Sequence, residues 1–151
     1  MWATHILAIA ERGVPAALPA PRVLVADDSP EMLGLLSAWL EDEGCVVIAV
    51  GSGREALDAS AAYRPDVAFL DVVLPPPDGF QLCEMLTRRG GPAVVLMTGM
   101  SKPDSRRVEE AGALLLLQKP FLREAVVDAL TLALQHHRSA GAADSPTAAA
   151  T

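Results

Sequence analysis

Three aspartates have the chemical type and the positions to act together. Asp27 and Asp28 follow the apolar residues 23–26, and Asp71 follows the apolar run 67–70. Short runs of this kind are typical of strands buried on both faces. A proline-rich turn begins a few residues after Asp71, so the third carboxylate should remain at the carboxyl tip of its strand. In an open parallel sheet, ligands bind at that end of the strands.

Two further polar residues hold equivalent positions. Thr98 follows the apolar run 93–97, and Lys119 comes just after the run 114–117. Because the carboxyl ends of parallel strands share one edge, we expect Thr98 and Lys119 to lie beside the three aspartates. Carboxylates that close repel one another unless a cation joins them. Ligation by oxygen alone, with room for water, favours Mg²⁺ over zinc, which makes the three aspartates the candidate metal ligands.

The set as a whole is suited to phosphoryl transfer. A metal ion, a lysine and a hydroxyl around one carboxylate can hold the equatorial oxygens of a phosphoryl group. Asp71 is then the candidate nucleophile, which attacks phosphorus and forms an acyl phosphate. Each feature alone has a more ordinary interpretation: an Asp-Asp pair before a helix is more often a cap, and Lys-Pro is usually a turn. Their joint placement at successive strand ends favours the site.

Five strands and five helices are expected to position these residues. The expected strands are 23–26, 45–50, 67–70, 93–97 and 114–117, and the expected helices are 30–43, 54–63, 80–89, 103–111 and 122–137. Strands rich in Val and Leu alternate with amphipathic helices, a pattern that favours a parallel sheet with helices on both faces. With right-handed crossovers, the prediction is a doubly wound, three-layer α/β domain with a five-stranded parallel sheet.

One folded domain should account for most of the 151 residues. Residues 1–20 contain Pro15 and Pro19 and lack a sustained period, which predicts a flexible N-terminal extension. Residues 139–151 consist mainly of Ala, Gly, Ser, Thr and Pro, which predicts a disordered, Ala-rich tail. The folded domain is therefore expected over residues 21–138.

Charge and composition exclude several classes of partner. The formal net charge is −7 and the pI is about 4.8, so the phosphate backbone of a nucleic acid would be repelled. Each apolar run is shorter than the roughly 18 residues of a membrane helix. Cys45 and Cys83 lack a CxxC spacing and are expected to be reduced thiols. We expect no nucleic-acid partner, no membrane contact and a cytoplasmic location.

The motifs occur in a specific order along the chain. They are Asp27-Asp28, Asp71-x-x-Leu74-Pro75-x-x-Asp78-Gly79, Thr98 after an apolar strand, and Gly112-Ala113 followed by Lys119-Pro120-Phe121. This set closely resembles the CheY-like response-regulator receiver domain, the phosphoacceptor module of two-component signalling, over about residues 22–137. The resemblance implies a flavodoxin-like (βα)5 fold and a role as a phosphoprotein in a phosphorelay.

The resemblance also implies a set of metal ligands. Asp28 would coordinate Mg²⁺ directly, and Asp27 would assist, often through water. Asp71 would bind the metal with its carboxylate, and the backbone carbonyl of Val73 would complete the protein ligands.

Three residues would act on the phosphoryl group, by the same resemblance. Asp71 would accept it from a phosphohistidine on a sensor histidine kinase or a histidine phosphotransfer protein. Thr98 and Lys119 would contact its oxygens, and the lysine would also pair with the unmodified carboxylate. No enzymatic activity is expected beyond Mg²⁺-dependent self-phosphorylation and slow self-dephosphorylation.

The chain departs from the family pattern at two places near the site. The family switch uses an aromatic residue on the fifth strand, where this chain has Leu116, and Gly99 stands where alanine is usual. Output should then depend on the loop after Thr98 or on a different repacking. Val73 and Met100, expected to flank the phosphoryl group, are apolar and cannot orient an attacking water, so we expect a long-lived acyl phosphate.

Output is expected through protein–protein contact by a stand-alone receiver with an unknown downstream protein. Val127 and Leu132 could form part of a homodimer contact or pack at the margin of the core. One alternative is a receiver used as a constitutive docking scaffold, an interpretation that Leu116 supports. Another is a dehalogenase-like phosphatase, which is disfavoured because Val73 stands where such an enzyme needs an acid.

Overall fold

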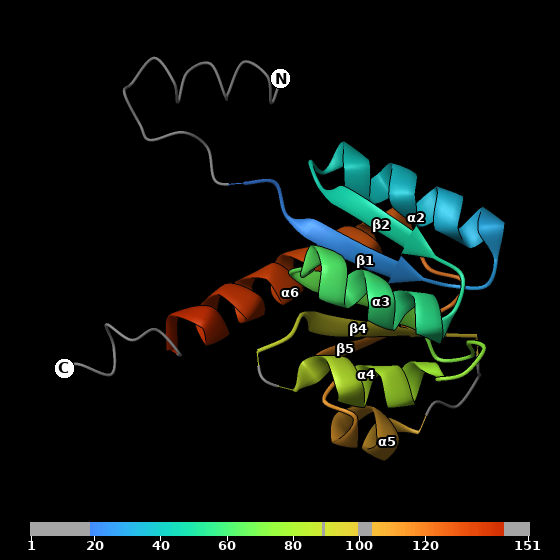
Figure 1. Cartoon of the computed structure of the whole chain (residues 1–151). Helices are drawn as coiled ribbons and strands as arrows, with labels where there is room; N and C mark the ends of the chain where they lie inside the picture. The colour runs from blue at the N-terminus through green and yellow to red at the C-terminus, as the bar shows by residue number, and fades with distance from the viewer. Residues whose placement is uncertain (1–18, 89, 100–103, 144–151) are drawn as a thin grey trace, which may run out of the picture.

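The computed structural model describes residues 19–88, 90–99 and 104–143, in which five strands alternate with five helices (Figure 1). The strands are β1 (Arg22–Ala26), β2 (Val46–Val50), β3 (Val67–Asp71), β4 (Ala93–Thr98) and β5 (Leu115–Gln118). The helices are α2 (Pro30–Asp42), α3 (Gly53–Tyr63), α4 (Gly79–Thr87), α5 (Ser105–Glu110) and α6 (Arg123–Ala143).

The strands form one parallel sheet in the order β2-β1-β3-β4-β5. One apolar cluster packs α3, α4 and α5 on one face of the sheet, and a second packs α2 and α6 on the other, so the domain has three layers (Figure 1). The predicted doubly wound α/β fold, with its five-stranded parallel sheet, is therefore confirmed. Every residue of β3 and of β4 is buried, as their uninterrupted apolar runs predicted.

The register brings the polar residues after the strands to one edge. Asp71, the last residue of β3, lies opposite Met97, and Thr98, the last residue of β4, lies opposite Gln118. The backbone N–H of Lys119 donates to the carbonyl of Thr98 at 2.7 Å, so the β4–β5 pairing continues one residue past β5. The ends of β3, β4 and β5 are thus fixed relative to one another by backbone hydrogen bonds.

The start of α2 explains how the segment after β1 is shaped. Ser29 is the N-cap, with its hydroxyl accepting a hydrogen bond from the Met32 N–H at 3.3 Å. Pro30 occupies the first helical position, where its missing N–H leaves no backbone hydrogen bond unmade. Asp27 and Asp28 are therefore held in a short link between a buried strand and a capped helix.

Most helix boundaries lie within two residues of the sequence prediction, and the end of α6 differs most. Helix α6 continues to Ala143, past the expected end near His137, so residues 139–143, predicted to begin a disordered tail, are helical. Alanine has the highest intrinsic helix propensity, which lets an Ala-rich segment extend a helix already nucleated on the sheet. Helix α5 begins at Ser105 with Asp104 as its N-cap. The predicted start at residue 103, the extension over 1–18 and the tail over 144–151 lie outside the described residues.

Candidate functional site

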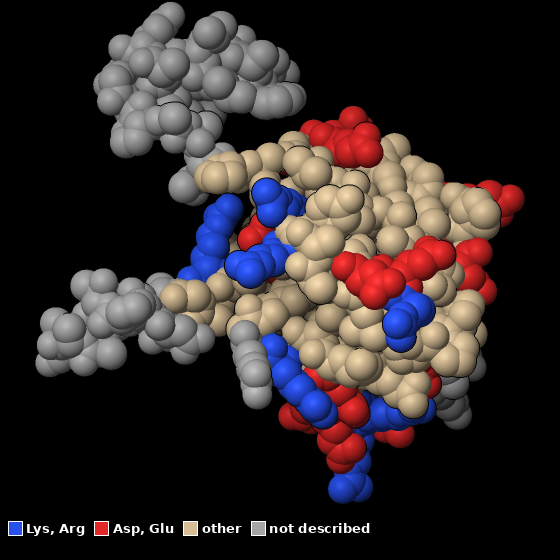
Figure 2. Space-filling view, in the orientation of Figure 1, with Lys and Arg blue, Asp and Glu red and all other residues tan. Residues whose placement is uncertain are grey.

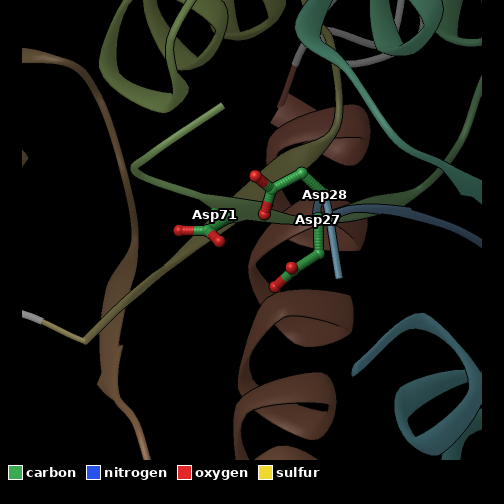
Figure 3. A group of neighbouring side chains, drawn as sticks. All are labelled: Asp27, Asp28 and Asp71. Carbon is green, nitrogen blue, oxygen red and sulfur yellow. The ribbon is translucent and has the colours of Figure 1, made fainter. Parts of the chain in front are cut away.

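The tips of β1 and β3 bring the three predicted aspartates together (Figure 3). Each of Asp27, Asp28 and Asp71 offers a carboxylate oxygen, and these atoms all lie within 4.8 Å of one another. Asp27 is fully buried and Asp71 is 6% exposed, whereas Asp28 is exposed. The acidic cluster therefore has two members in the protein interior and one at its mouth.

Lys119 joins the two buried carboxylates. Its Nζ lies 2.7 Å from Oδ2 of Asp27 and 3.0 Å from Oδ2 of Asp71, so it donates a charge-assisted hydrogen bond to each. The other oxygen of each carboxylate accepts from a backbone amide: Asp27 from Ser29 at 2.9 Å, and Asp71 from Val73 at 3.0 Å. Each buried aspartate thus has one oxygen fixed by the backbone and one held by the lysine.

The surroundings change the proton affinity of both partners. Burial raises the pKa of Asp71 above that of an ordinary carboxyl group, and the nearby charge of Asp27 adds to this, although the hydrogen bonds from Val73 and Lys119 act in the opposite direction. For Lys119, burial favours the neutral amine, but the hydrogen bonds and charges of the two aspartates outweigh it and raise the pKa. Lys119 is therefore a firmly protonated cation between two carboxylates.

A close backbone approach fixes the loop after Asp71. A Cβ added at Gly79 would overlap the backbone carbonyl of Asp71, and the Gly79 N–H donates to the carbonyl of Val72 at 3.0 Å. Asp78 caps α4 by accepting from the Gln81 N–H at 2.9 Å, and the Gln81 side chain accepts from the Asp78 N–H at 3.0 Å. The Asp-Gly pair is thus a structural requirement of the strand end that carries Asp71.

The residues present fit a hard divalent cation. Three carboxylates converge, all the candidate ligand atoms are oxygens, and the exposed Asp28 leaves one side open to water, the donor set that Mg²⁺ prefers. Lys119 partly neutralises the charges of Asp27 and Asp71, but it forms no ion pair with Asp28. That the Val73 backbone carbonyl is a metal ligand stays a prediction. The observed hydrogen bond to Asp71 comes from the Val73 amide and does not involve the carbonyl.

Thr98 lines a cavity next to the strand end that carries Asp71. It is 1% exposed at the end of β4 and lines a cavity of about 340 Å³ together with Leu116 of β5. Leu116 is partly buried against the apolar cluster under α3, α4 and α5, so the position expected for an aromatic residue has an aliphatic side chain beside an open space.

Sequence reasoning missed a contact between two residues that line this cavity, Phe80 and Arg107. The Arg107 guanidinium lies over the Phe80 ring, 4.2 Å from its centroid, and 3.7 Å from the carboxylate of Asp78. The contact joins α5 to the start of α4, and Phe80 and Arg107 both line the cavity. The two residues are 27 positions apart in the chain (107 − 80), and no local pattern indicates that they meet.

Comparison with known proteins agrees with this geometry. Residues 23–131 match the response regulator receiver domain family. The chain is 33% identical over 125 residues to the transcriptional regulatory protein PdtaR of Mycobacterium tuberculosis, covering 82% of this chain and 60% of that protein. It is 36% identical over 103 residues to the DNA-binding response regulator MtrA of Mycolicibacterium smegmatis, covering 66% of this chain and 44% of that protein. The chain thus spans less than two thirds of the length of both relatives.

Solved structures show the same architecture. The chemotaxis response regulator CheY4 of Vibrio cholerae aligns with a TM-score of 0.71 at 28% identity, covering 77% of this chain and 100% of that one. A putative response regulator from Chloroflexus aurantiacus aligns with a TM-score of 0.72 at 27% identity, covering 78% of this chain and 99% of that one. The match over residues 23–131 and the shared fold show that this chain belongs to the response regulator receiver domain family.

Proposed function

We propose that this protein is a signalling receiver that accepts a phosphoryl group on Asp71 from a phosphohistidine of a sensor histidine kinase or a histidine phosphotransfer protein. The observation that carries the proposal is the pairing of Asp71 with Lys119 at 3.0 Å, beside Asp27 and the exposed Asp28. An Asp71 oxygen attacks phosphorus, the phosphorus–nitrogen bond of the donor breaks, and the bonding electron pair leaves with the imidazole. The product is an acyl phosphate on Asp71.

Asp27, Asp28 and Asp71 would hold Mg²⁺, with the Val73 carbonyl as a further proposed ligand. Bound Mg²⁺ would neutralise charge on the phosphoryl oxygens and on the attacking carboxylate during transfer. The backbone amide of Val73, 3.0 Å from Oδ1 of Asp71, orients the carboxylate before the reaction. The limited exposure of Asp71 restricts the access of bulk water to the reacting atoms.

Lys119 and Thr98 would receive the transferred group. The lysine already holds an oxygen of Asp71, so a short movement of a flexible, four-carbon side chain takes its ammonium to a phosphoryl oxygen. Thr98 ends the neighbouring strand and can present its hydroxyl to the same group. The new dianionic group would then be matched by charge and by a hydrogen-bond donor.

The acyl phosphate should be long-lived. A polar side chain that positions water for attack on phosphorus would accelerate hydrolysis, and Val73, which is 63% exposed beside Asp71, is apolar. Met100, the second flanking residue in this proposal, lies outside the described part of the chain. A half-life of seconds for the phosphorylated protein would contradict this part of the proposal.

The output would be protein–protein contact in the cytoplasm. A second copy of the chain is one candidate partner, because Leu132 is 50% exposed on α6, although Val127 is partly buried. The second candidate function is a constitutive docking scaffold. Leu116 favours it, because an aliphatic residue beside the cavity at Thr98 lacks the aromatic part of the expected switch.

Incubation with acetyl phosphate and Mg²⁺ separates these functions. A stable adduct of one phosphoryl group, seen by intact-mass measurement, supports the receiver. Absence of an adduct on correctly folded protein supports the scaffold. Release of phosphate from unrelated phosphomonoesters in repeated turnovers would instead indicate the dehalogenase-like phosphatase that the sequence disfavours.

A further inference from the structure

A cleft lies near the amino-terminal ends of the strands, opposite the strand ends that carry the aspartates. It has a volume of about 460 Å³ and is formed by the segment that enters β1, the link between α3 and β3, and the C-terminal half of α6. Its lining residues are Pro19, Ala20, Pro21, Arg22, Arg64, Asp66, Leu134, His137 and Arg138. Strand β1 has five residues, so about 17 Å of strand separates Arg22 from Asp27.

The cleft is basic on an acidic protein. Three arginines line it against one aspartate, whereas the whole chain has a formal net charge of −7. Figure 2 shows basic side chains gathered on the side of the molecule where β1 begins, with acidic atoms between them. Local positive charge that opposes the overall charge needs its own explanation, because it does not follow from composition.

The single aspartate of the cleft is already used within the fold. One oxygen of Asp66 accepts from the backbone N–H of Arg22 at 2.8 Å, and the other lies 3.4 Å from Nε2 of His137. The guanidinium of Arg22 donates to the carbonyl of Tyr63 at 2.8 Å. Among residues 19–88, 90–99 and 104–143, no carboxylate forms an ion pair with Arg64 or Arg138. Both guanidinium groups can therefore receive an external anion.

The backbone at Arg64 gives a second, independent indication. Arg64 caps α3 in the left-handed conformation, with φ of 47° and ψ of 67°, and it alone among the described non-glycine residues has a positive φ. Glycine usually takes this position and asparagine sometimes does, because most other side chains there cost about 1 kcal/mol or more. Strained residues of this kind cluster at ligand sites, so Arg64, which also ends α3, is a candidate binding residue.

We propose that this cleft binds a small, soluble ligand that carries a phosphate group. The volume lies within the range of small-molecule sites, and prolines and Leu134 supply the apolar walls that such sites combine with a few polar groups. The guanidinium groups of Arg64 and Arg138, with the N–H groups of Arg22 that do not bond Tyr63, provide more donors than the two oxygens of a carboxylate accept. A terminal phosphate with three oxygens matches them better. The proposal does not depend on phosphorylation of Asp71.

Calorimetric titration with sodium pyrophosphate tests the proposal. The full chain is titrated in a buffer with EDTA at constant ionic strength, so that no divalent cation can bridge the probe to the aspartates. We expect one binding site per chain, weaker binding of sodium malonate, and an unchanged affinity in Asp71→Asn. Malonate binding as tight as that of pyrophosphate, or a loss of binding in Asp71→Asn, would overturn the proposal.

Two substitutions separate binding from folding. Arg64→Gly should raise the thermal midpoint in the absence of anions, because glycine relieves the left-handed strain, and should weaken pyrophosphate binding about tenfold. Adding Arg138→Gln should weaken it further. The control Arg54→Gln removes an exposed arginine that is paired with Asp58, outside the cleft, and should change the affinity less than about twofold. Equal affinities in Arg64→Gly and Arg54→Gln would rule out the site.

Discussion

Lys119 and Asp71 are 48 residues apart in the chain, and their Nζ and Oδ2 atoms lie 3.0 Å apart in the fold. The same Nζ reaches Asp27, 92 residues away, at 2.7 Å. One cation thus compensates two buried carboxylates, while Asp28 faces water. This arrangement suits a metal-free receiver, in which the lysine limits repulsion between the carboxylates.

Replacing Lys119 by methionine should destabilise the metal-free protein by about 3 kcal/mol, because it leaves Asp27 and Asp71 as buried, unpaired charges. Methionine keeps most of the apolar stem, so the change reports on charge more than on packing. Urea unfolding in EDTA measures the difference. Addition of Mg²⁺ should recover part of the lost stability, and a loss below about 0.5 kcal/mol would show that the lysine does not carry the compensation.

Mg²⁺ should raise the thermal midpoint of the wild-type protein, because a ligand that binds only the folded state stabilises it by mass action. Asp28→Asn removes the exposed member of the cluster and should abolish most of this shift while leaving the metal-free midpoint nearly unchanged. Scanning calorimetry over a range of Mg²⁺ concentrations checks both expectations. An equal shift in wild type and Asp28→Asn would place the metal elsewhere.

Gly79→Ala should destabilise the protein by more than about 2 kcal/mol and reduce phosphorylation, because the new Cβ would overlap the backbone carbonyl of Asp71. Gly34→Ala is the matched control: it lies within α2 with nothing near the added Cβ. Alanine there should stabilise the helix by about 0.5–1 kcal/mol. Chemical unfolding and the extent of modification by acetyl phosphate are measured for both; similar behaviour of the two variants would contradict the close approach at Gly79.

The stability of the fold should fall at alkaline pH because of Cys83. Burial raises the pKa of this thiol from its ordinary value of 9.0 to about 12. A group with a raised folded-state pKa contributes stability that is present below the unfolded value and is lost as pH rises toward the folded one. Between pH 9 and about 12, wild type should therefore lose more stability than Cys83→Ala, as measured by urea unfolding at each pH. Parallel curves for the two proteins would contradict this assignment.

The sequence was sufficient to predict the strand ends and the convergence of the three aspartates with Lys119. Uninterrupted apolar runs that stop at Asp27, Asp71 and Thr98 leave little choice of strand position, and parallel topology then brings these ends to one edge. The same reasoning predicted that Lys119 lies beside the aspartates, where it bonds Asp27 and Asp71.

Contacts between distant elements were beyond sequence reasoning. In each buried carboxylate, one oxygen bonds a backbone amide and the other bonds Lys119. This arrangement, like the stacking of Arg107 on Phe80, depends on side-chain geometry set by packing. The basic cleft joins Arg22, Arg64 and Arg138 from three elements, and a search for adjacent basic residues misses such a patch. The predicted end of α6 near His137 was wrong, because an Ala-rich segment can form either a disordered tail or a helix.

The central claim is that Asp71 is the phosphoacceptor. The most direct measurement treats the protein with acetyl phosphate and Mg²⁺, reduces the acyl phosphate with borohydride, and locates the product by peptide mass spectrometry. Reduction of an aspartyl phosphate yields homoserine, and we predict homoserine in place of Asp71 in wild type, with no such product in EDTA and none in Asp71→Asn. Homoserine at Asp27 or Asp28 instead, or an equal phosphoryl adduct in Asp71→Asn, would contradict the account.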